Sequence, residues 1–174
     1  MTMYVDMVNY GAAAQVEWSY NVANLANAGL TEEQKALATV VGETKNILVK
    51  GDGYAGTTLS LKENILLNIV FRNATIDKAA YAVVSYTGYK GGENSYRVEA
   101  SEFQALGGTM KYVQIDTLKI ADYAQEVTVE LYDADGNVLS TCVESIESYL
   151  TRNPKALHDA TMAFCIGAYN YLPK

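Results

Sequence analysis

The stretch Glu126–Val143, EVTVELYDADGNVLSTCV, holds the pattern that decides the fold. Apolar and polar side chains alternate on both sides of its DADGN segment, which is typical of β-strands with one buried face. A glycine-containing turn between two such runs closes an antiparallel hairpin. The sequence therefore predicts two paired strands, at 126–132 and 138–143.

The same alternation recurs upstream in five segments: TLSLK (58–62), ILLNIVFR (65–72), YAVVSY (81–86), SYRVEA (95–100) and KYVQIDTL (111–118). TGYKGGEN, between Tyr86 and Ser95, predicts a second hairpin turn. No helix follows the glycine-rich GDGYAG (51–56) to hold a phosphate, so this segment is interpreted as a loop leading into a strand. About seven short strands, antiparallel where hairpins join them, indicate a β-sandwich.

Helical sequence precedes these strands. Apolar side chains recur every three or four residues from Met3 to Tyr20, which predicts an amphipathic helix with Trp18 in its buried row. The TEEQ motif is a capping box, in which Thr31 caps a short helix and Gln34 reaches back to it. The N-terminal part of the chain is therefore expected to be helical.

A second helical region follows the last strand. SIESYLTR (145–152) predicts a short helix, and the final segment predicts a longer one with Asn153 as its N-cap and Pro154 at its first position. Two apolar rows in this last helix indicate burial on two sides. We expect it to pack against the first helix, with Gly11 facing Gly167.

These elements predict an α+β fold: an antiparallel β-sandwich of about seven strands with the N- and C-terminal helices packed together beside it. The chain is expected to form a single module, 1–174, which is helical at 3–39, a β-sandwich at 45–143 and helical again at 144–172. Because helical sequence begins at once, without a cap or a leader, the module is expected to be a piece of a longer protein.

The composition excludes several classes of partner. Hydrophobic residues make up 49% of the 174 residues and charged residues 19%, which is typical of a globular chain. The net charge is −7, with 13 Lys and Arg against 20 Asp and Glu, so the chain lacks the basic clusters that bind nucleic acid or anionic membranes. No apolar run approaches the roughly 18 residues of a membrane-spanning helix, so membrane insertion is not expected.

Residues that support catalysis or metal binding are few. His158 is the one histidine, no nucleophile motif accompanies it, and it is interpreted as a solvated helix residue. One histidine and two cysteines are too few ligands for most zinc sites. The side-chain oxygens of DADGN (133–137) alternate as in calcium-binding loops, and a hairpin turn accounts for them. Four acids lie in or near strands without a spacing that pairs them across a cleft: Glu99, Glu102, Asp116 and Glu130. The sequence therefore predicts no enzyme activity, no metal and no cofactor.

The two cysteines leave two alternatives open. Cys142 lies in a predicted strand and Cys165 in the predicted last helix. A secreted chain allows them to form one disulfide. Their apolar surroundings also suit free thiols that pack as small hydrophobic side chains, which is the favoured interpretation.

Tyrosine is the compositional outlier, with 14 residues against three Phe and one Trp. Tyr86, Tyr89 and Tyr96 gather with Lys90 around a polar hairpin tip. Flat rings beside hydrogen-bonding groups fit a sugar face or a protein epitope, so these four residues are the candidate binding site. The alternative is that they only frame a turn, as tyrosines on the outer faces of a sheet also would.

Much of the chain resembles an uncharacterised accessory module of large secreted or surface-attached proteins of gut-dwelling Gram-positive bacteria. The segments that carry the resemblance are DMVNYGAAAQ, NLANAGLTEEQKAL, YAVVSYTGYKGGENSYRVEASEF, YDADGNV and SIESYL. The resemblance implies an extracellular or cell-surface location, a non-catalytic role, further helical sequence upstream and neighbouring domains in the same polypeptide. It carries over no site residues.

The expected function is that of a non-catalytic binding or adhesion module. Its ligand would be a glycan or a host protein, an immunoglobulin being one such partner. A structural spacer without a ligand is the alternative, and a glycoside hydrolase-type enzyme is a distant one.

Overall fold

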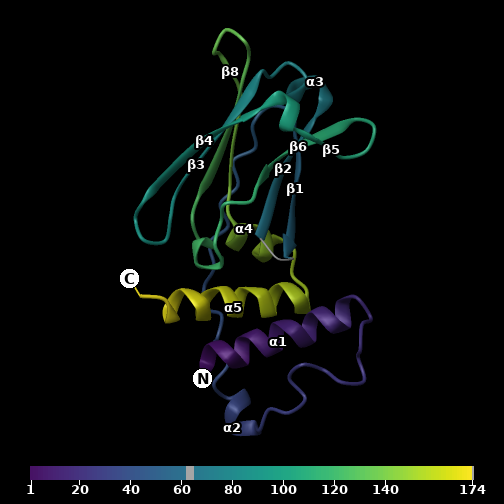
Figure 1. Cartoon of the computed structure of the whole chain (residues 1–174), viewed down its shortest axis with the longest axis vertical. Helices are drawn as coiled ribbons and strands as arrows, with labels where there is room; N and C mark the ends of the chain where they lie inside the picture. Colours follow the sequence, from purple (N-terminus) through teal and green to yellow (C-terminus); the bar gives the residue numbers. More distant parts are fainter. Residues whose placement is uncertain (62–64, 174) are drawn as a thin grey trace. The chain divides into compact units, whose positions relative to one another are not determined.

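The computed structural model of the chain describes residues 1–61 and 65–173. The chain divides into two compact units: a β unit, residues 46–149, and a helical unit, residues 1–45 and 150–174. The colour ramp of Figure 1 traces how the chain starts in the helical unit, completes the β unit and then returns.

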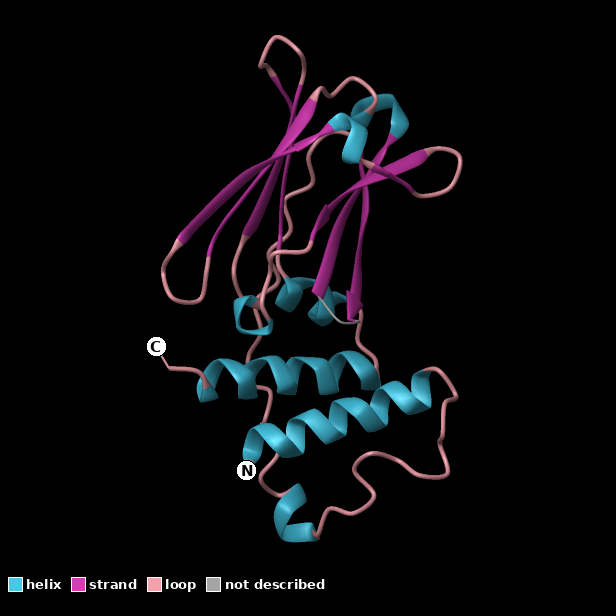
Figure 2. Ribbon diagram, viewed as in Figure 1, coloured by secondary structure: helices cyan, strands magenta, loops and turns pink. Residues whose placement is uncertain are grey.

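In the described residues of the β unit, eight antiparallel strands form two four-stranded sheets, drawn in magenta in Figure 2. One sheet has the order β1-β2-β6-β5 and the other β4-β3-β7-β8. The strands are β1 (Tyr54–Leu61), β2 (Ile65–Arg72), β3 (Tyr81–Thr87), β4 (Glu93–Glu99), β5 (Gln104–Ala105), β6 (Met110–Ile115), β7 (Val127–Tyr132) and β8 (Val138–Glu144). The predicted sandwich-like α+β fold is confirmed; Lys62, the expected end of one strand, lies outside the described residues.

Short helical turns connect the strands. They are α3 (Asn73–Ile76), η1 (Ala100–Glu102) and η2 (Ile120–Asp122). The predicted short helix after the last strand is α4 (Ile146–Arg152), which contains the junction between the two units.

The core of the β unit follows the predicted alternation. In β7, Val127, Val129 and Leu131 are buried, and the residues between them are partly exposed. On the outer face of the same sheet, Tyr81 and Tyr132 occupy opposite positions on β3 and β7, and their rings stack with centroids 5.0 Å apart. Some tyrosines therefore do cover an outer sheet face.

The DADGN segment forms the predicted hairpin turn. The Asp133 carboxylate accepts the backbone N–H of Asp135 at 2.9 Å and that of Asn137 at 2.8 Å, and Gly136 supplies a positive φ of 82°. The hydrogen bond from the Asn137 side chain is the main reason that the pKa of Asp133 lies below its ordinary value. These internal bonds account for the acidic residues of the turn.

One side of the sandwich is left open. Strand β5 pairs with β6 through two residues only, opposite Tyr112 and Lys111. In the described chain, the rest of β6, from Val113 to Ile115, therefore has a strand partner on its β2 side alone. Strand β4 is likewise an edge strand, paired only with β3. The candidate site described below is built at these two free edges.

The helical unit contains α1 (Thr2–Glu17), α2 (Glu32–Lys35) and α5 (Ala156–Tyr171). As predicted, the two long helices lie side by side (Figure 1). Tyr10 stacks on Phe164 with ring centroids 5.9 Å apart, and Glu17 at the end of α1 pairs with Lys155 before α5. This end-to-start pairing makes the two helices antiparallel.

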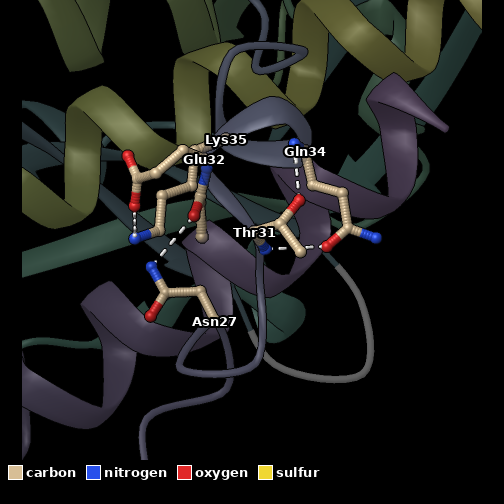
Figure 3. A network of polar contacts seen from close by, with 6 residues as sticks. Asn27, Thr31, Glu32, Gln34 and Lys35 are labelled. Atoms are coloured by element: carbon tan, nitrogen blue, oxygen red, sulfur yellow. Dashed lines mark hydrogen bonds and ion pairs between the residues drawn. The ribbon is translucent and has the colours of Figure 1, made fainter.

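The predicted capping box before α2 is confirmed in Figure 3. The Thr31 hydroxyl accepts the Gln34 backbone N–H at 3.2 Å, and the Gln34 side chain accepts the Thr31 N–H at 2.9 Å. The Asn27 side chain, labelled in the same view, lies in the preceding loop. It donates to the Asn9 side chain of α1 at 2.9 Å, which ties this loop to that helix.

The expected contact between Gly11 and Gly167 is wrong. A Cβ at Gly11 would lie 3.2 Å from the Ala26 Cβ, so Gly11 makes room for the loop before α2. Gly167 instead faces the Asp6 carboxylate and the Thr39 hydroxyl. The two glycines therefore serve different close approaches, Gly11 to the loop before α2 and Gly167 to the Asp6 side chain of α1.

Two expectations at helix ends are also wrong. Trp18 is not core but 61% exposed, because α1 ends at Glu17 and positive φ values at Ser19 and Asn21 turn the chain away. The last helix starts at Ala156 after Lys155 rather than at the expected Asn153 cap and Pro154. A residue before proline avoids the helical region, and here the Asn–Pro pair forms the turn between α4 and α5.

Candidate functional site

The hairpin between β3 and β4 bends toward the segment that follows β6 and encloses a pocket of about 290 Å³. We call it the tip pocket. Hairpin residues Tyr86, Tyr89, Lys90 and Asn94 line one side, and Thr117, Lys119 and Asp122 line the other. Gly91, at a positive φ of 81°, allows the tight turn at the hairpin tip.

Asp122 holds the two sides of the tip pocket together. The residue is 3% exposed, and its carboxylate accepts the backbone N–H of Tyr89 at 2.7 Å and that of Lys119 at 2.8 Å. Charge-assisted bonds of this kind are among the stronger ones in proteins. The carboxylate therefore fixes the position of the Tyr89 backbone and satisfies its own charge within the protein.

A chain of hydroxyl groups runs from the tip pocket along β4. The Tyr86 hydroxyl is directed at the carbonyl and hydroxyl oxygens of Thr117, at 3.2 and 3.1 Å, and the Thr117 hydroxyl donates to the Tyr96 hydroxyl at 3.3 Å. Burial is the main reason that the pKa of Tyr96 lies above its ordinary value. Tyr96 therefore keeps its proton and can donate it to an acceptor outside the protein.

A second pocket, of about 570 Å³, adjoins the first at Thr117. We call it the side pocket because it lies between the free edges of β4 and β6. Its polar lining residues include Tyr96, Arg97, Glu102, Gln104, Gln114 and Asp116. Amide groups with both donors and acceptors, placed beside a tyrosine ring, can bind neutral polyhydroxyl compounds.

Three of the four predicted binding residues, Tyr86, Tyr89 and Lys90, line the tip pocket. The fourth, Tyr96, lines the side pocket and joins the first group through Thr117. Lys90 stays near the Tyr89 ring, with its Nζ 5.7 Å from the ring centroid. The hairpin residues chosen from the sequence thus border one continuous polar surface.

Sequence reasoning missed the opposite wall, at 117–122. Thr117 and Asp122 lie about thirty residues beyond the hairpin, so no local pattern connects them with it. The one local signal is that Asp122 comes three residues after Lys119, the spacing of a carboxylate that caps a helical turn.

The four acids considered as candidate hydrolytic residues, Glu99, Glu102, Asp116 and Glu130, do not form one cluster. Glu99 pairs with Arg97, and Glu130 accepts the Tyr132 hydroxyl at 2.8 Å. Glu102 and Asp116 both line the side pocket, but both are exposed, and Glu102 accepts the Glu99 backbone N–H at 2.8 Å. A glycosidase needs one acid held in a desolvated setting, which neither residue has.

Residues 1–61 and 65–173 contain no group of three or more His, Cys, Asp and Glu side chains that could hold a metal ion. Within the same ranges, no helix has both the length and the apolar character needed to cross a bilayer.

His158 is half-buried rather than solvated as expected. Its ring contacts the Asn153 carbonyl, and it borders a pocket whose other walls include Val41, Leu150 and Met162. Burial lowers the pKa of His158 below its ordinary value, which favours the neutral imidazole. Thr44, Thr151 and Asp159 line the same pocket, so the imidazole borders both apolar and polar groups.

Cys142 and Cys165 are both free thiols and both buried, so the structure favours the second of the two alternatives. The Cys142 sulfur accepts the Gly51 backbone N–H at 3.4 Å. Burial raises the pKa of the Cys142 thiol and raises that of Cys165 to about 12.

Both thiols should therefore resist labelling in the folded protein. At about pH 8, a thiol with the raised pKa of Cys165 has roughly a thousandfold less thiolate than an ordinary cysteine. We expect the chromogenic disulfide DTNB to react slowly with native protein and to titrate two thiols in guanidinium chloride. Rapid labelling of the native chain, or a mass 2 Da low after unfolding without reductant, would contradict this assignment.

No protein-family model, curated protein or solved structure matches the chain.

Proposed function

We propose that the chain is a non-catalytic binding module that takes an extracellular glycan along the tip and side pockets. The observation that carries the proposal is the continuity of these pockets through the chain of hydroxyls from Tyr86 over Thr117 to Tyr96. Sugars offer a weakly polar face for a ring and hydroxyl groups that both donate and accept, which this lining matches.

The concave shape supports a glycan over a host protein. Small-ligand sites enclose roughly 300–1,000 Å³, and the tip and side pockets, at about 290 and 570 Å³, fall near this range. Protein interfaces instead bury about 800 Å² per partner around an apolar centre. Here the walls combine tyrosine rings with hydroxyl, amide and charged groups.

One observation favours the structural spacer as a second candidate. The Tyr86 hydroxyl and the Asp122 carboxylate are already used within the protein. If the remaining lining groups have no ligand, these bonds serve only to fasten the hairpin to the 117–122 segment.

A glycan array with the wild-type chain and two tyrosine variants tests the proposal. Tyr89→Ala removes a half-buried ring from the tip pocket, whereas Tyr20→Ala removes a more exposed ring from the helical unit. We expect Tyr89→Ala to weaken glycan binding at least about tenfold, as the loss of a buried aromatic contact does, and Tyr20→Ala to leave it unchanged.

Three other results would each favour a different function. Failure of a correctly folded wild-type chain to bind any glycan would favour the spacer. Release of new reducing ends from a bound glycan would favour the hydrolase. Binding of deglycosylated immunoglobulin through Tyr89 would move the ligand class to protein.

A further inference from the structure

Two lysines from opposite walls border the tip pocket. Lys90 comes from the hairpin and Lys119 from the segment after β6, and both are exposed. In the described part of the chain, neither ammonium forms an ion pair, and the Lys90 ammonium lies near the Tyr89 ring. Resting on the glycan proposal, we infer that the tip pocket takes a sugar residue that carries a carboxylate.

The acids around the tip pocket are already satisfied. Asp122, the acid in its lining, gives one carboxylate oxygen to each of two backbone N–H groups. Glu93, next to the hairpin tip, accepts the Thr87 hydroxyl at 2.8 Å. The lining of the tip pocket therefore carries two ammonium groups against one buried carboxylate that pairs with neither, in a chain whose net charge is −7.

The side pocket has the opposite charge balance, with more acidic than basic groups. This difference defines the orientation of the ligand across the two pockets. Glu102 and Asp116 line it together with Arg97, whose guanidinium is already paired with Glu99. Like charges in one pocket repel, so a carboxylate is disfavoured there. An acidic sugar therefore belongs in the tip pocket, and a neutral sugar belongs beside the Gln104 and Gln114 amides.

Matched acidic and neutral probes test this inference. The probes are 3′-sialyllactose and a hyaluronan tetrasaccharide, each compared with its carboxyl methyl ester, which keeps the size and removes the charge. We expect the acid to bind about tenfold or more tightly than the ester at low salt, since a charge-assisted hydrogen bond is worth about 1.5–3 kcal/mol. Added salt should reduce the difference in affinity between the acid and the ester.

Lysine variants locate the effect. Lys90→Gln and Lys119→Gln should each weaken binding of the acid about tenfold and leave binding of the ester nearly unchanged. Lys78→Gln makes the same change in net charge at an exposed lysine outside both pockets, and it should have no effect.

The outcomes separate this inference from the proposed function. Equal binding of acid and ester, with Tyr89→Ala still disruptive, would overturn the acidic-sugar inference and leave the glycan proposal standing. An equal loss in Lys78→Gln would also overturn it, because overall charge would then explain the preference. If wild-type protein binds none of the probes and no glycan on the array, both fail.

Discussion

Gly167→Leu should lower the free energy of unfolding by about 3 kcal/mol or more, because a side chain at this position overpacks a closed contact. A Cβ on Gly167 would overlap the Asp6 carboxylate. Asp6 is fully buried and accepts the Thr39 backbone N–H at 2.8 Å and the Thr39 hydroxyl at 2.6 Å. Moving the carboxylate would leave a buried charge and two donors without partners.

Urea unfolding followed by circular dichroism measures this effect. Gly167→Ala is the informative companion, because alanine normally stabilises a helix by about 1 kcal/mol over glycine, and here it should destabilise. Gly29→Ala is the control, since a Cβ there meets nothing within 4 Å. An unchanged midpoint for Gly167→Leu would mean that Asp6 and Thr39 do not pack against this helix position.

Asp122→Ala should cost about 2–4 kcal/mol of stability and also abolish glycan binding. It leaves the backbone N–H groups of Tyr89 and Lys119 without their acceptor and frees the hairpin from the 117–122 segment. Asp122→Asn keeps one acceptor oxygen and should lie between alanine and wild type. Asp135→Ala, at an exposed turn residue, should change neither property.

Hydrogen exchange identifies the cause of this loss. In Asp122→Ala, the amides of Tyr89 and Lys119 should exchange faster than they do in the wild type. Amides in the centre of β3, which keep their ladder bonds, should exchange at the wild-type rate. Uniformly faster exchange throughout the β unit would instead indicate general unfolding, and the carboxylate would have no special role at the pocket.

Much of the β unit could be predicted because its signals are local. The alternation in Glu126–Val143 and the turn chemistry of Asp133 and Gly136 both act within a few residues, and both are confirmed. Strand β5 (Gln104–Ala105) was missed because two residues are too short to show a period. It is also what leaves the side of the sandwich open.

The predicted ends of the first and last helices were wrong for a different reason. The apolar row of the first helix continues in the sequence to Trp18, but the backbone leaves the helix one residue earlier. Periodicity describes side chains and does not report where the backbone turns. Likewise, Asn153 and Pro154 have the composition of a helix start but supply the preceding turn.

The candidate site was half predictable for a related reason. Tyr86, Tyr89, Lys90 and Tyr96 share one hairpin, so a single stretch of sequence brings them together. Their partners at 117–122 reach them only through the pairing of strands into sheets, which the sequence pattern does not specify. Tertiary topology, rather than residue preference, completes the pocket.

The division into two units determines when each unit can be completed during synthesis. Residues 46–149 leave the ribosome as one uninterrupted stretch, but α1 needs Phe164 and Gly167, which are made more than 140 residues after it begins. At roughly 5–20 residues per second, α1 waits on the order of ten seconds or more without its partner helix. During translation, α1 is thus made before the β unit but is among the last of these segments to acquire its native neighbours.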